Sequence, residues 1–299
     1  MSTKLAAPKT RFNFDYIGNK WIGFAVTGLL VLVTAYSLYT KGLNFGIDFT
    51  GGIVIEARTE TNAQLDKLRK ILNTGEFGDV SLQAFADPRD FMIRLQSTNE
   101  DAQQKLVEDI KLKLSAGYSE KIEYRKVDYV GAVVGKELIE GSIIALGLSL
   151  LAMLAYLWFR FELQYGIGGI VALFHDALIT IGFYSVTQLQ FDLTSIAALL
   201  TIVGYSINDS VVIYDRIREN FRKYKALAIG DIINLSVNET LSRTFMTGGT
   251  VLLSAGALAM FGGDVISGFS LAMIFGVVIG TYSSIYISAT ILIFLKLKR

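Results

Sequence analysis

Six apolar runs, each long enough to cross a bilayer, dominate the pattern of hydrophobic and polar positions along the chain. A membrane-spanning helix needs about 20 residues at a rise of about 1.5 Å per residue. In chain order the runs are Trp21–Tyr39, Leu138–Phe159, Tyr165–Val186, Leu193–Tyr214, Phe245–Phe261 and Gly268–Leu295. The pattern therefore predicts an α-helical membrane protein with six transmembrane helices.

Residues 40–137, between the first two runs, show the pattern of a small soluble domain. Alternating segments predict strands and segments with helical spacing predict helices. The strands are expected at Gly52–Arg58, Val80–Phe85, Phe91–Leu95 and Lys121–Tyr129, and the helices at Asn62–Leu72 and Asn99–Leu114. This β-α-β-β-α-β order predicts one α+β ferredoxin-like domain. The predicted division is a terminal segment 1–20, a helix 21–39, the domain 40–137, helices over 138–295, and a tail 296–299.

Composition supports the membrane class and excludes several kinds of site. Hydrophobic residues make up 52% of the chain and charged residues only 18%, less charge than in ordinary soluble proteins. The chain has no cysteine and a single histidine, so thiolate and multi-histidine metal sites cannot form within it. The external domain carries no nucleophile–base pair, and no basic tract is interleaved with aromatic residues. We expect a protein that is not an enzyme, needs no cofactor or metal and binds no nucleic acid.

The distribution of lysine and arginine predicts the orientation. Arg160 follows the second run, and six basic residues lie between the fourth and fifth runs; Lys296, Lys298 and Arg299 follow the sixth. The opposite loops, Thr187–Asp192 and Gly262–Ser267, contain none. By the positive-inside rule we expect both termini to be cytoplasmic and residues 40–137 to lie on the outer side of the membrane. The first run is too long for the apolar part of a signal peptide, which predicts an uncleaved anchor.

Asp209 lies inside the fourth apolar run, where a carboxylate is costly. Insertion scales give about 2.5–3.5 kcal/mol for a charged residue at membrane depth, so an acid kept there suggests proton use. Asp209 precedes Arg216 by seven residues, which places it roughly 10 Å inside the cytoplasmic end of the helix. Asn208 is its neighbour. The alternative is a carboxylate held neutral or paired for helix packing.

Three further residues are candidates for the same proton-coupling site. Arg243, just before the fifth run, is the natural counter-charge for Asp209, although an arginine there could simply mark the membrane boundary. His175 and Asp176 lie midway along the third run, where either could extend a proton path. Sequence neighbours on a helix point about 100° apart, so these two do not share a face. A neutral histidine bonded between helices is the alternative.

A glycine-rich segment follows the first run. Gly46–Gly52 reads GIDFTGG and contains Gly46, Asp48, Gly51 and Gly52. Glycine permits backbone angles that other residues avoid, which indicates a hinge or tight junction between membrane and domain. A flexible loop is the alternative. The segment lacks the Lys-Ser/Thr of a phosphate-binding loop.

Several of these segments together resemble the SecF family, the smaller membrane subunit of the SecD–SecF complex of bacterial protein export. The resemblance runs from about Phe14 to the C-terminus. Its motifs are GIDFTGG, VGAVVGKEL at Val130–Leu138, the His175–Asp176 pair, Leu200–Asn220, TLSRT at Thr240–Thr244 and GTYSSIY at Gly280–Tyr286. The resemblance also implies membership of the resistance-nodulation-division (RND) superfamily.

This resemblance implies specific partners and roles. SecD and the SecYEG channel are the expected partners in the bacterial inner membrane, with an exported polypeptide, protons and membrane lipid as the other contacts. Asp209 matches the family's membrane aspartate tied to proton use, and Arg243 matches the arginine of TLSRT. The glycine-rich segment and the Val130–Leu138 segment, with Gly131 and Gly135, would pass helix motion to the external domain.

The expected function is therefore proton-driven assistance to the late stages of polypeptide export. The rival is half of an RND small-molecule efflux pump, but such pumps usually have larger external domains, and residues 40–137 leave little room for a drug-binding cleft. A non-transporting scaffold for the channel would leave Asp209 unexplained.

Overall fold

The computed structural model describes residues 11–72, 77, 80–84, 87–95, 103–262 and 264–295. The chain forms two compact units: one comprises the chain up to residue 44, 145–190 and the chain from 194 onward, and the other comprises 45–144 and 191–193. We call these the membrane unit and the external unit. The predicted tail 296–299 and the first half of the predicted segment 1–20 lie outside the described residues.

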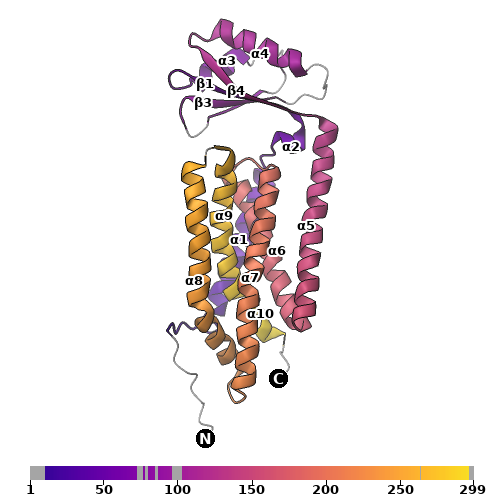
Figure 1. Cartoon of the computed structure of the whole chain (residues 1–299), viewed down its shortest axis with the longest axis vertical. Helices are drawn as coiled ribbons and strands as arrows, with labels where there is room; N and C mark the ends of the chain where they lie inside the picture. Colours follow the sequence, from indigo (N-terminus) through magenta and orange to yellow (C-terminus); the bar gives the residue numbers. More distant parts are fainter. Residues whose placement is uncertain are drawn as a thin grey trace. The chain divides into compact units, whose positions relative to one another are not determined.

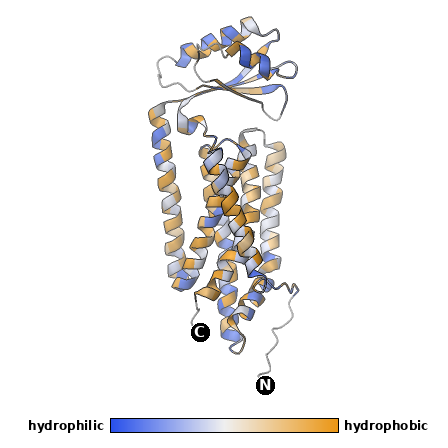
Figure 2. Ribbon diagram, turned by 180° about the vertical axis from the view of Figure 1, so that it is seen from behind, coloured by the Kyte–Doolittle hydropathy of each residue, from blue (hydrophilic) through white to orange (hydrophobic). Residues whose placement is uncertain are grey.

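Six helical segments of the described chain are long and apolar enough to cross a membrane (Figure 1). They are α1 (Lys20–Thr40), α5 (Ala132–Arg160), α6 (Leu163–Thr187), α7 (Leu193–Lys223), α8 (Ile229–Phe261) and α9 (Asp264–Ser283), which continues through the π-helical turn η2 (Ser284–Ser288) into α10 (Ala289–Phe294). Apolar residues cover most of their length (Figure 2). The prediction of an α-helical membrane protein with six spans is confirmed.

Two helices extend well beyond the apolar runs that predicted them. α7 continues past Tyr214 to Lys223, and α8 begins at Ile229 rather than at Phe245. Hydropathy marks where a helix leaves the bilayer, whereas its hydrogen bonds continue through polar residues that favour helix. The polar end of α7 is supported by an ion pair between Arg216 and Glu219, three residues apart on the helix, at 2.5 Å. Arg243 consequently lies within α8 and not before it.

Small residues let the membrane helices approach closely. A Cβ added at Gly182 would lie 2.1 Å from Thr34 Oγ1 of α1, and one at Gly276 would lie 2.3 Å from Ile202 of α7. In lipid, helix association depends on such close packing and on hydrogen bonds between helices. At Gly276 this close approach leaves room for glycine alone.

The external unit is a four-stranded antiparallel sheet with two helices. Its elements are a one-turn helix α2 (Ile47–Thr50), β1 (Gly52–Thr59), α3 (Leu65–Leu72), β2 (Val80–Ala84), β3 (Asp90–Leu95), α4 (Gln103–Gly117) and β4 (Ile122–Val130). The sheet order is β2-β3-β1-β4. This arrangement fits the predicted ferredoxin-like order roughly, with α2 added and the register of β1 against β4 shifted between Glu56 and Ala57. The predictions for residues 85 and 99–102 lie outside the described residues.

Alternation along β1 builds the core of this unit. Ile53, Ile55 and Ala57 are buried together with residues of α3 and α4 such as Leu68 and Ile110. Successive side chains on a strand point to opposite faces, and Val54 accordingly packs on the other face with Ile47 and Met92. Both faces of the central strand are therefore covered.

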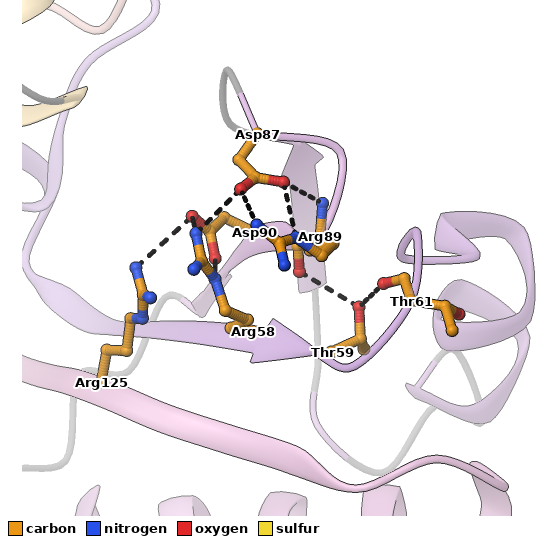
Figure 3. A network of polar contacts seen from close by, with 7 residues as sticks. All are labelled: Arg58, Thr59, Thr61, Asp87, Arg89, Asp90 and Arg125. Atoms are coloured by element: carbon orange, nitrogen blue, oxygen red, sulfur yellow. Dashed lines mark hydrogen bonds and ion pairs between the residues drawn. The ribbon is translucent and has the colours of Figure 1, made fainter.

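A cluster of charged side chains fastens the β2–β3 turn to β1 (Figure 3). Arg58 of β1 donates from Nε to Asp90 Oδ1 at 2.5 Å and from Nη2 to Asp87 Oδ2 at 3.0 Å. Arg89 donates to Asp87 from its backbone N–H at 3.0 Å and from Nη2 at 2.8 Å. Asp90 is buried, so these charge-assisted hydrogen bonds supply the partners that a buried carboxylate needs.

Acid is expected to weaken this cluster through Asp87. Hydrogen bonds from the Arg89 side chain and then its backbone N–H hold the pKa of Asp87 well below its usual value of 3.8. A carboxyl with a lowered folded pKa adds stability that is fully present above the unfolded pKa and lost as pH falls through the folded pKa. Between about pH 5 and about pH 2, the thermal midpoint of the full-length protein in detergent should fall further for wild type than for Asp87→Asn. Parallel pH curves would contradict this role of Asp87.

Candidate functional site

Asp209 is buried in the interior of the membrane unit. The residue belongs to α7 and is only 4% exposed. Asp209 Oδ1 accepts a hydrogen bond from Thr244 Oγ1 of α8 at 2.6 Å, while Oδ2 is a buried oxygen without a hydrogen-bond partner among the described residues. An unmatched buried acceptor is costly, and protonation at Oδ2 would remove the charge. The carboxyl is thus held in position by one oxygen and left chemically open at the other.

Arg243 does not form the predicted ion pair with Asp209 in the described part of the chain. Arg243 is exposed, whereas the next residue, Thr244, is buried and reaches the carboxylate. The reason is geometric, since neighbours on a helix diverge by about 100°. Arg243 still lies within electrostatic range of Asp209, so it can act on that carboxylate through space.

His175 and Asp176 form a second buried acidic group, on α6. Asp176 is fully buried, and its Oδ1 lies 3.0 Å from His175 Nδ1. Two serines from other helices donate to Asp176 Oδ2: Ser206 of α7 at 2.5 Å and Ser283 of α9 at 2.7 Å. The two residues were expected to face apart, but the flexible side chains bend to meet. Asp176 therefore ties together α6, α7 and α9.

Further serine hydroxyls lie along α7, next to these buried acids. Ser206 and Asp209 are three residues apart and so lie on neighbouring positions of one helix face. Ser210, which follows Asp209, shares a hydrogen bond of 3.0 Å with Ser284 of η2. A hydroxyl both donates and accepts, which is the property a proton relay needs. We call His175, Asp176, Ser206, Asp209, Ser210, Thr244, Ser283 and Ser284 the polar layer.

The serines and threonine of the polar layer were missed as functional residues. Neither Ser283 nor Ser284 was predicted to belong to the site, and Arg243 was favoured over Thr244. The signal was present for the serines, because each is a polar residue within the fourth or the sixth apolar run. What the sequence lacks is the information on which helices are neighbours.

Asn208 lies outside the polar layer. It is exposed on α7, as are Thr201 on the same helix and Arg243, Thr250 and Ser254 on α8. We call these residues the exposed polar stripe. Polar side chains within spanning helices normally face protein or water rather than lipid. Thr201, Thr250 and Ser254 donate to carbonyl oxygens of their own helices, whereas Asn208 and Arg243 are better suited to contact with protein or water than with lipid.

The predicted junction residues form a compact structure in the external unit. Gly46 N donates to Phe191 O at 2.8 Å, and Asp48 Oδ2 accepts from the backbone N–H of Leu193 at 3.1 Å. Leu193 is the first residue of α7, so Asp48 caps the helix that carries Asp209, where a negative charge is favourable. The ring of Phe49 lies 5.9 Å from that of Phe191. These contacts give the segment Gly46–Gly52 a defined conformation within the external unit.

The remaining junction glycines serve backbone geometry and close contact. Gly51 and Gly52 have φ values of 69° and 127°, which favour glycine. A Cβ at Gly135 of α5 would lie 2.9 Å from the carbonyl oxygen of Phe49. Gly131, just before α5, accepts a hydrogen bond at 3.0 Å from Gly135 N. The start of α5 is thereby fitted closely against α2.

Replacing Gly51 by alanine is expected to strain this junction. Its φ of 69° and ψ of 165° lie in a region that is essentially restricted to glycine, and holding another residue there costs about 1–3 kcal/mol. Unfolding of the full-length protein by denaturant in mixed micelles would show the loss. Gly141→Ala is the control, because a Cβ there meets nothing within 4 Å and helix propensity favours alanine by about 1 kcal/mol. Equal effects at the two glycines would exclude a special role of Gly51.

Comparison with protein families gives two matches. The model described as "Protein export membrane protein SecD/SecF, C-terminal" matches residues 110–298, and the model described as "SecD/SecF GG Motif" matches residues 36–63. The second match includes Asp48 and the junction glycines 46, 51 and 52. The two matched regions thus contain the polar layer and the capped junction.

Curated proteins and solved structures agree with these matches. The protein translocase subunit SecF of Rickettsia felis is 49% identical over 282 residues, covering 94% of this chain and 92% of the relative. That of Rickettsia bellii is 47% identical over 289 residues, covering 97% and 95%. The crystal structure of SecDF, a translocon-associated membrane protein from Thermus thermophilus, matches with a TM-score of 0.86 and 35% identity over 97% of this chain. A SecDF structure in a super-membrane-facing form gives 0.70 and 36%. This chain spans 40% of each SecDF chain.

Proposed function

Since this chain belongs to the SecD/SecF family, as a SecF subunit of the protein translocase, we propose that it uses the proton gradient to assist late stages of polypeptide export. The chain acts as a non-enzymatic transport subunit with no cofactor and no nucleic-acid partner. Its substrate is the exported polypeptide, and its site is the pair of buried acids Asp209 and Asp176 with His175 and Arg243.

The observation that carries the proposal is the half-satisfied carboxyl of Asp209. Thr244 fixes one oxygen and the other is open, so loading a proton changes the local charge without dismantling the site. One charge crossing about 100 mV releases about 2.3 kcal/mol, enough to bias a two-state rearrangement of helices. A cation near a carboxylate stabilises its charged form, and this is the role proposed for Arg243 after the proton leaves.

A SecD subunit is the proposed cover for the exposed polar stripe. Its residues lie on α7 and α8, Asn208 being next to Asp209 in sequence, and polar residues exposed at membrane depth favour a protein partner over lipid. This chain corresponds to 40% of the SecDF chains, which leaves the larger part of such an assembly for the partner. The SecYEG channel is the further partner from which the polypeptide emerges.

The chain is proposed to lie in the bacterial inner membrane with both termini cytoplasmic and the external unit periplasmic. The basic ends of α5 and α7 support this orientation through the positive-inside rule. Asp48, which caps α7 sixteen residues before Asp209 (209 minus 193), provides the link by which a shift of α7 reaches the periplasmic unit.

Release of an exported protein from spheroplasts tests the proposal. A depletion strain carrying this chain should release the protein several-fold faster with a proton gradient than after addition of an uncoupler, and cells without the chain should show no such difference. Drug susceptibility of the same strain examines the efflux alternative. Normal export with increased drug sensitivity on depletion would replace the export function with a pump.

A further inference from the structure

A charged pocket lies at the basic end of the membrane unit, away from the polar layer. Its volume is about 570 Å³, within the usual range of ligand sites of about 300–1,000 Å³. Its lining residues come from the end of α5 and from the last turns of α7, two helix ends that can be followed in Figure 1. The lining residues are Arg160, Asp215, Arg218, Glu219, Arg222 and Lys223. Four cations face two carboxylates, which leaves two positive charges in excess.

Both carboxylates of the pocket are already engaged. Asp215 accepts from Arg160 Nη2 at 2.9 Å and 3.0 Å with its two oxygens. Glu219 is paired at 2.5 Å with Arg216, which does not line the pocket. Within the part of the chain that the structure describes, the other three lining cations, Arg218, Arg222 and Lys223, form no salt bridge. Unmatched cations in a concave site attract an anion.

The buried ring of Phe161 holds two of the guanidinium groups in place. The Arg160 and Arg218 Cζ atoms lie 4.9 Å and 5.5 Å from the ring centroid. Arg218 also donates to the Arg160 carbonyl oxygen at 3.4 Å. Stacking reduces the freedom that a guanidinium loses on binding, and its planar fork fits the oxygens of a phosphate. The site is therefore arranged for a phosphate before any ligand arrives.

The surroundings of the pocket point to a lipid as the carrier of that phosphate. Trp158 and Phe159, directly before Arg160, are 68% and 94% exposed at the end of α5. Aromatic residues beside basic residues are typical of the level at which lipid headgroups lie. The hydrophilic end of α5 follows a long apolar surface (Figure 2), along which an acyl chain can lie. A free phosphate ion would use none of this apolar surface.

We propose that this pocket binds the phosphate headgroup of an anionic phospholipid, with Arg218, Arg222 and Lys223 as its ligands and the apolar surface of α5 against its acyl chains. In the orientation given above the lipid belongs to the cytoplasmic leaflet, whose anionic lipids attract basic segments at the membrane surface. The bound lipid would fix the α5–α6 turn against the end of α7.

Lipid titration followed by native mass spectrometry of the full-length protein tests the site. Each basic residue near a headgroup contributes about fivefold in affinity. The variant Arg218→Gln/Arg222→Gln/Lys223→Gln should therefore bind phosphatidylglycerol about a hundredfold more weakly, with phosphatidylcholine binding unchanged. The matched control Lys67→Gln/Lys70→Gln/Lys105→Gln removes the same charge from exposed positions of the external unit and should bind phosphatidylglycerol like wild type.

Two results would overturn the proposal. One is equal phosphatidylglycerol affinity in wild type and the pocket variant. The other is displacement of phosphatidylglycerol by inorganic phosphate at equal concentration, which would make the pocket a site for the free ion. Should the triple variant fail to fold, Arg222→Gln alone decides the matter. Arg222 is exposed, and its loss is expected to weaken phosphatidylglycerol binding about fivefold.

Discussion

Asp209→Asn is expected to abolish the gradient-dependent part of polypeptide release while leaving the protein folded and assembled. Asparagine has nearly the same shape as aspartate and can still accept from Thr244 through its amide oxygen. It cannot carry a proton. A gradient of about 100 mV acting on one charge supplies about 2.3 kcal/mol, equivalent to a bias of about fiftyfold. Release with a gradient should therefore fall to the rate measured after uncoupling.

Thr244→Val is the graded companion to this substitution. It removes the hydrogen bond from Thr244 Oγ1 to Asp209 Oδ1 and keeps the acid, so we expect partial coupling with a shifted pH dependence of release. Export activity of Asp209→Asn equal to wild type, at equal protein level, would make Asp209 a packing residue. A loss in Asp209→Asn that is matched by loss of the protein from the membrane would likewise count against a coupling role.

Asp176→Ala is expected to give the largest loss of stability among substitutions in the polar layer. It leaves His175 Nδ1 and the hydroxyls of Ser206 and Ser283 without their common acceptor. Each unsatisfied buried donor costs about 1–3 kcal/mol. Ser283 can turn to the Gly280 carbonyl, which lies 3.1 Å away, so the total should be about 3 kcal/mol. Denaturation in mixed micelles measures this loss.

Asp176→Asn separates stability from proton transfer at the same position. The amide oxygen can accept from the serines, and the loss of stability should stay near 1 kcal/mol. If Asp176 takes part in coupling, release with a gradient should nevertheless fall several-fold. Full release in Asp176→Asn together with the instability of Asp176→Ala would assign Asp176 to helix packing alone. Ser206→Ala is a milder control, since it removes one donor and no acid.

Periodicity in the sequence was sufficient for the architecture. The apolar runs located six spans, and alternation at Gly52–Arg58 located the central strand, because burial imposes those periods wherever an element lies against a core. The sequence position of Asp209 alone marked it as unusual. The length of α8 was not predictable in this way, since its first four turns are polar enough to lie beyond the bilayer and yet remain helical.

The partners within the site could not be read from the chain. Asp176 meets Ser206 and Ser283, which are 30 and 107 residues away, and Asp48 meets Leu193 at a separation of 145. Helical spacing tells which residues share a face of one helix but not which helix that face meets. For the same reason Arg243 was favoured for its charge, although it is the side chain of Thr244 that points toward Asp209.

The π-helical turn η2 has a geometric consequence for the last span. An α-helix advances about 100° per residue, so residues five apart diverge by about 140°. A π turn closes its hydrogen bonds at five residues, and Ser283 can face Asp176 while Ser288 donates to Tyr214 Oη at 2.6 Å. With one extra residue in this turn, the side chains that follow it are shifted by about 100° around the helix axis. One span thereby directs its serines to two different helices, Ser283 to α6 and Ser288 to α7.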